Sequence, residues 1–164
     1  MFDAALIARA KALIAAYTER GEKIVTAESC TGGLIAALLT EIPGSSAVVE
    51  RGYVTYSNEA KAEALGIEPV LIAQRGAVSR EVALAMAEGA LTLSRADVSV
   101  SVTGIAGPGG GNAAKPVGLV HFALARRGVE TRHVERRFGD LGRSAVRNGA
   151  LEAALAMLET AART

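Results

Sequence analysis

The sequence predicts an α/β protein in a single domain, residues 1–164, and three observations lead to this fold class. Short β-branched segments alternate with segments whose apolar residues recur at helical spacing, as in helices layered on a parallel sheet. Two late strand patterns are joined by a short segment that contains Arg-Arg-Gly, which predicts a hairpin and makes the sheet mixed. No repeat or linker interrupts the chain, and half of its residues are hydrophobic, enough to bury one core.

The first half of the chain predicts two strand-to-helix units after an N-terminal helix. Apolar residues from Leu6 to Tyr17 recur at helical spacing, and Gly21 ends this amphipathic helix. Strand and helix patterns then alternate twice. Strands are expected at 23–29 and 51–57, and helices at 31–42, opened by Thr31 and ended before Pro43, and at 58–65, ended by Gly66.

The second half predicts one long helix, a strand, a hairpin and a closing helix. Residues 68–78 are loop-like, with room for a short helix, and Ser79 is the cap of a helix over 79–96. Valines that alternate with serines predict a strand over 97–104, followed by a flexible Gly-rich connection over 105–116. The hairpin strands are expected at 117–125 and 130–138, and the last helix at 140–161.

The composition argues against nucleic-acid, membrane and metal binding. The formal net charge is +1, aromatic residues make up 4% and Trp is absent, so no basic or base-stacking surface is expected. No apolar run is long enough for a bilayer, and charged residues interrupt the N-terminal segment, so we expect neither a membrane span nor a signal peptide. Two histidines and a single Cys30 argue against zinc and fit the reducing cytoplasm.

Two predicted turns at strand ends carry glycines where a ligand can approach the backbone. In "AESCTGG" (27–33), the glycines allow close approach and the N–H groups at the helix start attract an anion. This segment lacks the Gly-Lys-Ser/Thr ending of a P-loop. In "VTGIAGPGGG" (102–111), five glycines form a loop that a bound ligand would order. An ordinary capped turn and a mobile surface loop are the alternative interpretations.

A third turn, within "GYVTYSNEAKAEALG" (52–66), places a phenol and an amine close together. If Ser57 or Asn58 caps the helix, Lys61 falls in its first turn, where the positive end of the helix dipole lowers the pKa of the amine. A neutral lysine is a general base toward a hydroxyl, and Tyr56 is placed to relay a proton or to orient the amine. The alternative is a lysine on a solvated helix face.

Two further catalytic schemes find less support. Cys30 stands at a helix start, where a lowered pKa would make it a nucleophile, but its natural partners His121 and His133 both lie in late predicted strands. A Ser-His-Asp triad is equally hard to assemble, because Asp97 and Asp140 have no evident link to either histidine. We therefore expect a buried structural cysteine and structural histidines.

Six motifs in order along the chain resemble the CinA C-terminal domain family: "TAESCTGG", "PGSSAV", "GYVTYSNEAK", "GAVS", "VSVTGIAGPGGG" with "KPVGLVHFALA", and a closing "FGD…R…VR" helix. The resemblance runs from residue 22 to the last helix. It implies a three-layer α/β/α sandwich on a mixed, mostly parallel sheet, a homodimer and no cofactor. The chain resembles the stand-alone form, which lacks the N-terminal domain of longer members, and this resemblance implies hydrolysis of the carboxamide of nicotinamide mononucleotide to nicotinate mononucleotide and ammonia.

The resemblance also implies roles for particular residues. Ser46 of "PGSSAV" matches the nucleophile, Lys61 its base and Tyr56 an assisting group. Arg143 is the candidate partner for a phosphate or for the tetrahedral intermediate, although two residues interrupt the family's Gly-Asp-Arg spacing here. The remaining residues expected to bind the substrate are Ser29, Thr31, Gly32, Gly33, Asn58, Thr103 and Gly104.

The assignment of Ser46 depends on where the second strand begins. If residues 46–56 formed one straight strand, Ser46 and Tyr56 would lie about 33 Å apart at ~3.3 Å per residue. Ser46 must therefore occupy a turn, with regular strand beginning near Gly52. If the strand is longer, Ser57 or Ser29 is the better nucleophile.

The sequence thus favours a metal-free amidohydrolase whose substrate is the small nucleotide nicotinamide mononucleotide. The alternative is a non-catalytic nucleotide-binding or regulatory module of the competence- and damage-inducible type, in which the Gly-rich turns hold a phosphate that Lys61 pairs with. A DNA-associated competence factor gains little support from the near-neutral charge.

Overall fold

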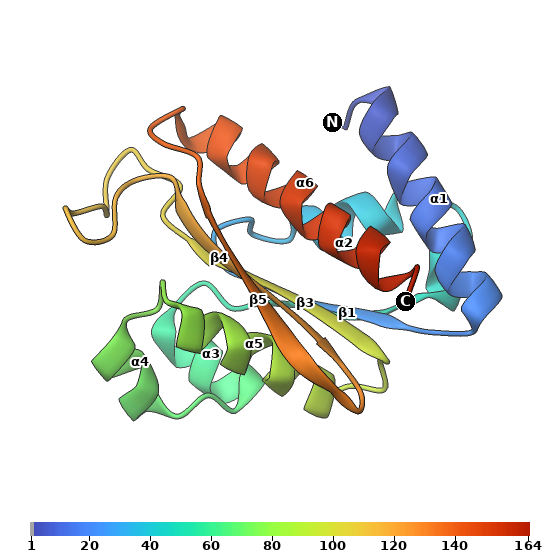
Figure 1. Ribbon diagram of the computed structural model, residues 1–164, viewed down its shortest axis with the longest axis horizontal. Coiled ribbons are helices and arrows are strands. Elements are labelled where there is room, and N and C mark those ends of the chain that lie inside the picture. The colour runs from blue at the N-terminus through green and yellow to red at the C-terminus, as the bar shows by residue number, and fades with distance from the viewer. Residues whose placement is uncertain (1) are drawn as a thin grey trace.

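A computed structural model describes residues 2–164 as a three-layer α/β/α sandwich (Figure 1). Its central five-stranded sheet has the order β2-β1-β3-β4-β5. The strands are β1 (Ile24–Glu28), β2 (Val49–Val54), β3 (Val98–Gly104), β4 (Leu119–Arg126) and β5 (Val129–Arg137). The predicted fold class is confirmed.

The directions of the strands make the sheet mixed and mostly parallel, as predicted. β1 pairs in parallel with β2 and β3, whereas β3–β4 and β4–β5 are antiparallel, so β4 runs opposite to the other strands of this sheet. The parallel register pairs Glu28 with both Val54 and Val102. The carboxyl ends of β1, β2 and β3 therefore meet at one edge of the sheet, where α/β proteins usually bind their ligands.

Helices cover both faces of the sheet. One face carries α1 (Ala4–Arg20), α2 (Leu34–Thr40) and α6 (Arg143–Ala161), and the other α3 (Asn58–Leu65), α4 (Pro69–Arg75) and α5 (Arg80–Thr92) (Figure 1). Because β1 and β3 are covered on both sides, their residues from Ile24 to Glu28 and from Val98 to Thr103 are all buried. In β3 the serines that alternate with valines are therefore buried as well. None of the helices in residues 2–164 is long and apolar enough to cross a membrane.

Local signals place most of the helix ends where the sequence predicts them. The Ser57 and Ser79 hydroxyls cap α3 and α5 by accepting hydrogen bonds from the N–H groups of Ala60 and Val82. Gly21 and Gly66 end α1 and α3 with φ of 65° and 66°, in the left-handed region that favours glycine.

Several boundaries differ from the prediction, among them the end of α5 at Thr92 rather than at residue 96 and the start of α6 at Arg143 rather than at residue 140, and two others bear on the choice of site residues. α2 begins at Leu34 rather than at Thr31, because the Thr31 hydroxyl donates to the buried Glu28 carboxylate instead of capping a helix. β2 begins at Val49, since the Ile24 N–H already bonds the Val48 carbonyl beside it. Residues 68–78, predicted as loop-like with a possible short helix, contain α4.

Candidate active site

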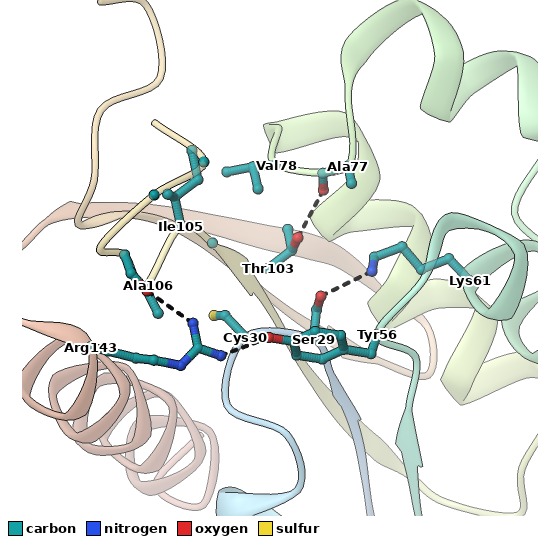
Figure 2. Close-up of a pocket in the computed structure, with 14 residues that line it drawn as sticks. Ser29, Cys30, Tyr56, Lys61, Ala77, Val78, Thr103, Ile105, Ala106 and Arg143 are labelled. Carbon is teal, nitrogen blue, oxygen red and sulfur yellow. Dashed lines mark hydrogen bonds between the residues drawn. The ribbon is translucent and has the colours of Figure 1, made fainter. Parts of the chain in front are cut away.

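A pocket lies at the carboxyl ends of the parallel strands, between the turn after β1, the start of α3 and the Gly-rich loop after β3 (Figure 2). Its lining brings together six of the residues that the sequence singled out: Ser29, Tyr56, Lys61, Thr103, Gly104 and Arg143. Backbone and apolar side chains of residues 77–78 and 105–106 complete its walls. The pocket therefore combines an apolar wall with a few polar groups, as small-molecule sites usually do.

The central contact of the pocket joins Lys61 to Ser29. The Lys61 Nζ atom lies 2.9 Å from the Ser29 Oγ atom and donates a 2.7 Å hydrogen bond to the Thr55 carbonyl (Figure 2). The lysine side chain is 1% exposed. Burial lowers the pKa of this amine, and the nearby Cys30 has a smaller, opposing effect. The direction agrees with the sequence prediction, but the first cause is burial rather than the helix dipole.

Short-range structure explains how Lys61 reaches the pocket. The Thr55 N–H bonds the Glu28 carbonyl, so the chain leaves β2 directly beside the end of β1. Ser57 then caps α3, and Lys61 is the fourth residue of that helix. In a helix the side chain leans toward the N-terminus, so the amine returns over the turn and meets Ser29.

The turn after β1 is organised around the buried Glu28 carboxylate. It accepts hydrogen bonds from the Thr31 hydroxyl at 2.7 Å and from the N–H groups of Gly33, Ile35 and Ala36 at 3.1, 3.1 and 2.9 Å. The anion at the start of α2 is thus supplied by the chain itself, where the sequence suggested a bound ligand. Thr31 and Gly33 shape this turn and do not line the pocket.

Gly32 belongs to the same turn and also lies outside the pocket lining. Its φ is 60°, and a Cβ atom there would lie 3.5 Å from the Arg147 guanidinium. The Thr31 hydroxyl, Gly32 and Gly33 therefore fix the conformation of the backbone that carries Ser29, and a role of these residues in binding the substrate stays a prediction.

Tyr56 and Arg143 meet at the rim of the pocket. The Arg143 guanidinium donates to the Tyr56 hydroxyl at 2.7 Å and to the Gly107 carbonyl at 3.0 Å (Figure 2). The Tyr56 side chain is 61% exposed, and its hydroxyl makes no hydrogen bond to Lys61 or Ser29. This arrangement links the first residue of α6, the end of β2 and the Gly-rich loop, and it leaves a cation at the mouth.

Thr103 and Gly104 end β3 at the floor of the pocket. The Thr103 hydroxyl donates to the Ala77 carbonyl at 2.8 Å and thereby fixes the apolar wall (Figure 2). At Gly104 a Cβ atom would lie 2.7 Å from the Val120 side chain and 2.9 Å from the Leu119 carbonyl. Packing against β4 therefore requires glycine at this position, independently of any ligand.

The structure does not bring Ser46 to Lys61 within this chain. Ser46 is exposed in the short 3-10 helix Ser45–Ala47, which precedes the amino end of β2, whereas Lys61 follows its carboxyl end. The six-residue strand between them spans about 20 Å at ~3.3 Å per residue. The expectation that regular strand begins near Gly52 is wrong, and so is the expected proximity of Ser46 to this amine. Asn58 is exposed at the start of α3 and lies outside the pocket lining.

The other catalytic schemes remain weak in three dimensions. Burial raises the pKa of the Cys30 thiol to about 11, so the thiolate is disfavoured at neutral pH. The His121 Nδ1 and His133 Nε2 atoms are 2.9 Å apart on β4 and β5, and neither ring lines the pocket. Within residues 2–164, no three His, Cys, Asp or Glu side chains gather as a possible metal site.

Sequence reasoning missed two charged residues that hold the turn after β1. The sequence pattern indicates only that Glu28 belongs to a strand, but an acid in a fully buried strand demands partners. Arg147 is the last residue of the closing motif, and its position in the sequence gives no sign of its partners. Its guanidinium donates to the carbonyls of Cys30 and Thr31 at 3.1 and 2.9 Å.

The fold and the pocket define an α/β protein that can hold a small ligand against a buried amine and a hydroxyl. The model of the CinA C-terminal domain family matches residues 7–162, and the chain belongs to this family. The resemblance seen in the sequence motifs is thereby confirmed.

Curated and solved relatives agree with this assignment. The chain is 50% identical over 159 residues to the nicotinamide-nucleotide amidohydrolase PncC of Escherichia coli (strain K12), covering 96% of this chain and 95% of that protein. It also resembles the crystal structure of the competence/damage inducible protein CihA from Agrobacterium tumefaciens, with a TM-score of 0.96 and 52% identity over 100% of this chain and 99% of the other. A CinA superfamily protein from Klebsiella pneumoniae matches with a TM-score of 0.90 and 35% identity over 96% of this chain and 98% of the other.

Proposed function

We propose that this protein is an amidohydrolase that converts nicotinamide mononucleotide and water to nicotinate mononucleotide and ammonia, with Ser29 as nucleophile and Lys61 as its base. The observation that carries the mechanism is the 2.9 Å contact between the Lys61 Nζ and Ser29 Oγ atoms inside the pocket. The similarity to the E. coli amidohydrolase supports the substrate. Ser29 replaces Ser46 in this role because Ser29 contacts the amine.

The surroundings of Lys61 favour its action as a base. Burial lowers the pKa of the amine and so favours its neutral form, and the Thr55 carbonyl accepts a 2.7 Å hydrogen bond from one of its N–H groups. The nitrogen lone pair is then available to the Ser29 hydroxyl proton. A neutral amine beside a hydroxyl is one of the ways in which enzymes activate serine.

The chemistry proceeds in two balanced steps. Lys61 takes the hydroxyl proton while the Ser29 oxygen bonds to the carboxamide carbon. The resulting tetrahedral intermediate expels ammonia, which receives its additional proton from the Lys61 ammonium. Water then attacks the Ser29 ester, with Lys61 again accepting and returning a proton, and the carboxylic acid leaves.

The rest of the pocket suits the two ends of this substrate. The apolar wall of Ala77, Val78 and Ile105 offers a surface for the pyridine ring. Arg143 at the rim is placed for the 5′-phosphate, since a guanidinium binds phosphate oxygens bidentately. Tyr56 acts in this scheme by orienting Arg143 through their 2.7 Å hydrogen bond.

The decisive test measures ammonia released from nicotinamide mononucleotide by purified protein in the presence of a chelator. We expect turnover by the natural chain and by the Ser46→Ala control, whose serine lies outside the pocket. Ser29→Ala and Lys61→Ala should lose activity by about a thousandfold or more while remaining folded. Full turnover by both of these variants would overturn the mechanism. A nucleotide that raises the melting temperature but is recovered unchanged would instead indicate a non-catalytic binding module.

The homodimer and the cytoplasmic location expected from the sequence also enter here as proposals. Support for a reducing compartment comes from the single, buried Cys30. Sedimentation equilibrium measures the mass of the assembly directly, and a monomer mass at micromolar concentration would contradict the dimer.

A further inference from the structure

The two residues after Ser29 present backbone N–H groups that lack a partner. Cys30 and Thr31 are 5% and 0% exposed, yet within residues 2–164 neither N–H donates a hydrogen bond. The neighbouring N–H groups are all used: that of Ser29 bonds the Val102 carbonyl, that of Gly32 bonds the Ser29 carbonyl, and that of Gly33 bonds Glu28. Unpaired buried N–H groups are rare in folded proteins, and two in succession indicate a site for an acceptor from outside the chain.

Arg147 determines which way this backbone faces. From the second turn of α6, its guanidinium binds the carbonyls of Cys30 and Thr31 at 3.1 and 2.9 Å. The peptide bond between these two residues is trans, so the Thr31 N–H points opposite to the Cys30 carbonyl. By holding that carbonyl toward α6, Arg147 turns the Thr31 N–H away from α6.

Glu28 holds the other side of the same turn. Its carboxylate binds the Thr31 hydroxyl and the first N–H groups of α2, whereas Arg147 binds only carbonyls. The turn is therefore held between the Glu28 carboxylate and the Arg147 guanidinium. The N–H groups of Cys30 and Thr31 contact neither of these two side chains. Arg147 itself does not line the pocket, so any effect on chemistry must pass through the backbone.

We propose that the N–H groups of Cys30 and Thr31 form the oxyanion hole for the reaction at Ser29, and that Arg147 is the positioning residue that keeps the Thr31 N–H aimed by binding the Cys30 carbonyl. The inference rests on the proposed function and extends it to the stabilisation of the intermediate. The N–H of the residue after a nucleophilic serine serves the oxyanion in other hydrolases, because it lies beside the oxygen that attacks. These two N–H groups would donate hydrogen bonds to the carboxamide oxygen as negative charge develops on it.

The test compares Arg147→Ala with a matched control, Arg9→Ala. Arg9 also makes two hydrogen bonds, to Glu159 on α6, but it lies on α1 away from the pocket. We expect kcat of Arg147→Ala to fall by about a hundredfold, the size of effect seen when an oxyanion donor is lost, with little change in KM. Arg9→Ala should keep its kcat. The activity of Arg147→Ala should rise over the same pH range as that of the natural chain, because Lys61 keeps its contacts.

Chemical rescue separates positioning from simple destabilisation. Millimolar ethylguanidine should restore part of the lost kcat to Arg147→Ala by filling the vacated site, whereas ethylammonium should not. If Arg147→Ala fails to fold, Arg147→Lys keeps the charge and can reach one carbonyl, so it should show an intermediate loss. Full kcat in the folded variant, or a loss that ethylguanidine leaves unchanged, would overturn the proposal.

A second readout does not depend on the substrate. The rate at which a fluorophosphonate modifies Ser29 can be followed by mass spectrometry, since the adduct also places an oxygen in the oxyanion hole. We expect Arg147→Ala to slow this modification and Arg9→Ala to leave it unchanged. Absence of ammonia release by the natural chain would refute the proposed substrate, while equal labelling rates in all three proteins would refute the role of Arg147.

Discussion

At the scale of single residues, the proposed mechanism depends on an amine whose pKa is lowered by burial. Lys61 is 1% exposed and contacts a hydroxyl and a carbonyl, and in the protonated form it would be an ammonium removed from water. The proposed activation of Ser29 therefore involves no histidine, and the two histidines of the chain lie on β4 and β5.

The lowered pKa of Lys61 predicts how activity changes with pH. Only the neutral amine can accept the Ser29 proton, and its fraction grows as pH rises through the pKa in the folded protein, which lies below the ordinary 10.5. We expect kcat/KM to increase as the pH rises through the pKa of Lys61 in the folded protein, and then to level off. A profile from pH 5 to 10 measures it, and a rate independent of pH over that range would contradict the role of Lys61.

The same residue predicts a change in the pH dependence of stability. The pKa of Lys61 is lower in the folded than in the unfolded chain, so the unfolded state binds more protons between the two pKa values and stability rises with pH there. Lys61→Met should remove this contribution and flatten the curve of unfolding free energy against pH. Urea titrations at several pH values measure the curve. Lys11→Met, at an exposed position on α1, is the control and should leave the slope unchanged.

At the scale of elements, the position of α3 depends on a glycine of α5. A Cβ atom at Gly89 would lie 2.2 Å from the Leu65 carbonyl oxygen at the end of α3. Glycine therefore allows the two helices to approach closely, although it costs helix propensity. Because α3 carries Lys61, this packing also determines where the amine lies.

Gly89→Ala should accordingly destabilise the protein. Alanine gains about 1 kcal/mol of helix propensity, but the overlap with a backbone atom should cost about 1–3 kcal/mol more than this gain. We expect a lower urea midpoint and reduced turnover, as α3 shifts away. Glu88→Ala, one position earlier and exposed, tests propensity without the contact, and an equal or higher stability of Gly89→Ala would refute the packing argument.

Local signals specify the elements well because each signal acts within a few residues. Ser57 and Gly66 bound α3 where the sequence places them, since a cap and a left-handed glycine need only their own turn. The prediction that α2 begins at Thr31 is wrong because a threonine before a helical pattern usually indicates a cap. Its hydroxyl instead binds Glu28, a partner that only the folded turn reveals.

At the scale of the whole molecule, the sheet that carries the site at the ends of β1, β2 and β3 also carries a histidine pair on β4 and β5. The His121 Nδ1 and His133 Nε2 atoms are 2.9 Å apart, and the rings are stacked with centroids 5.2 Å apart. Burial first lowers the pKa of both rings, and the charge of His133 lowers that of His121 further. The neighbouring charged groups oppose one another: Glu81 and Glu135 favour protonation, whereas Arg80 on α5 and Lys115 disfavour it.

This pair predicts a loss of stability in acid. Both pKa values lie below the ordinary 6.5, so the unfolded chain binds more protons once the pH falls below that value, and the fold loses stability as the pH drops toward the folded pKa values. His133→Gln keeps a hydrogen-bonding side chain without titrating, so it should lose less stability between neutral and acid pH. Thermal melts at a series of pH values measure the difference, and an unchanged acid slope would contradict it.

The order of strands and helices along the chain, most of their caps, the family and six of the residues that line the pocket can be predicted from the sequence. Each of these depends on periodicity, on local turn chemistry or on motifs that are contiguous in the chain. Which serine faces the amine depends instead on how the chain folds. Ser29 and Lys61 lie 32 residues apart, and the parallel register of β1 and β2 brings the carboxyl ends of both strands to one edge while leaving Ser46 at the other. Strand register is set by long-range pairing and packing, so no local pattern distinguishes the two serines.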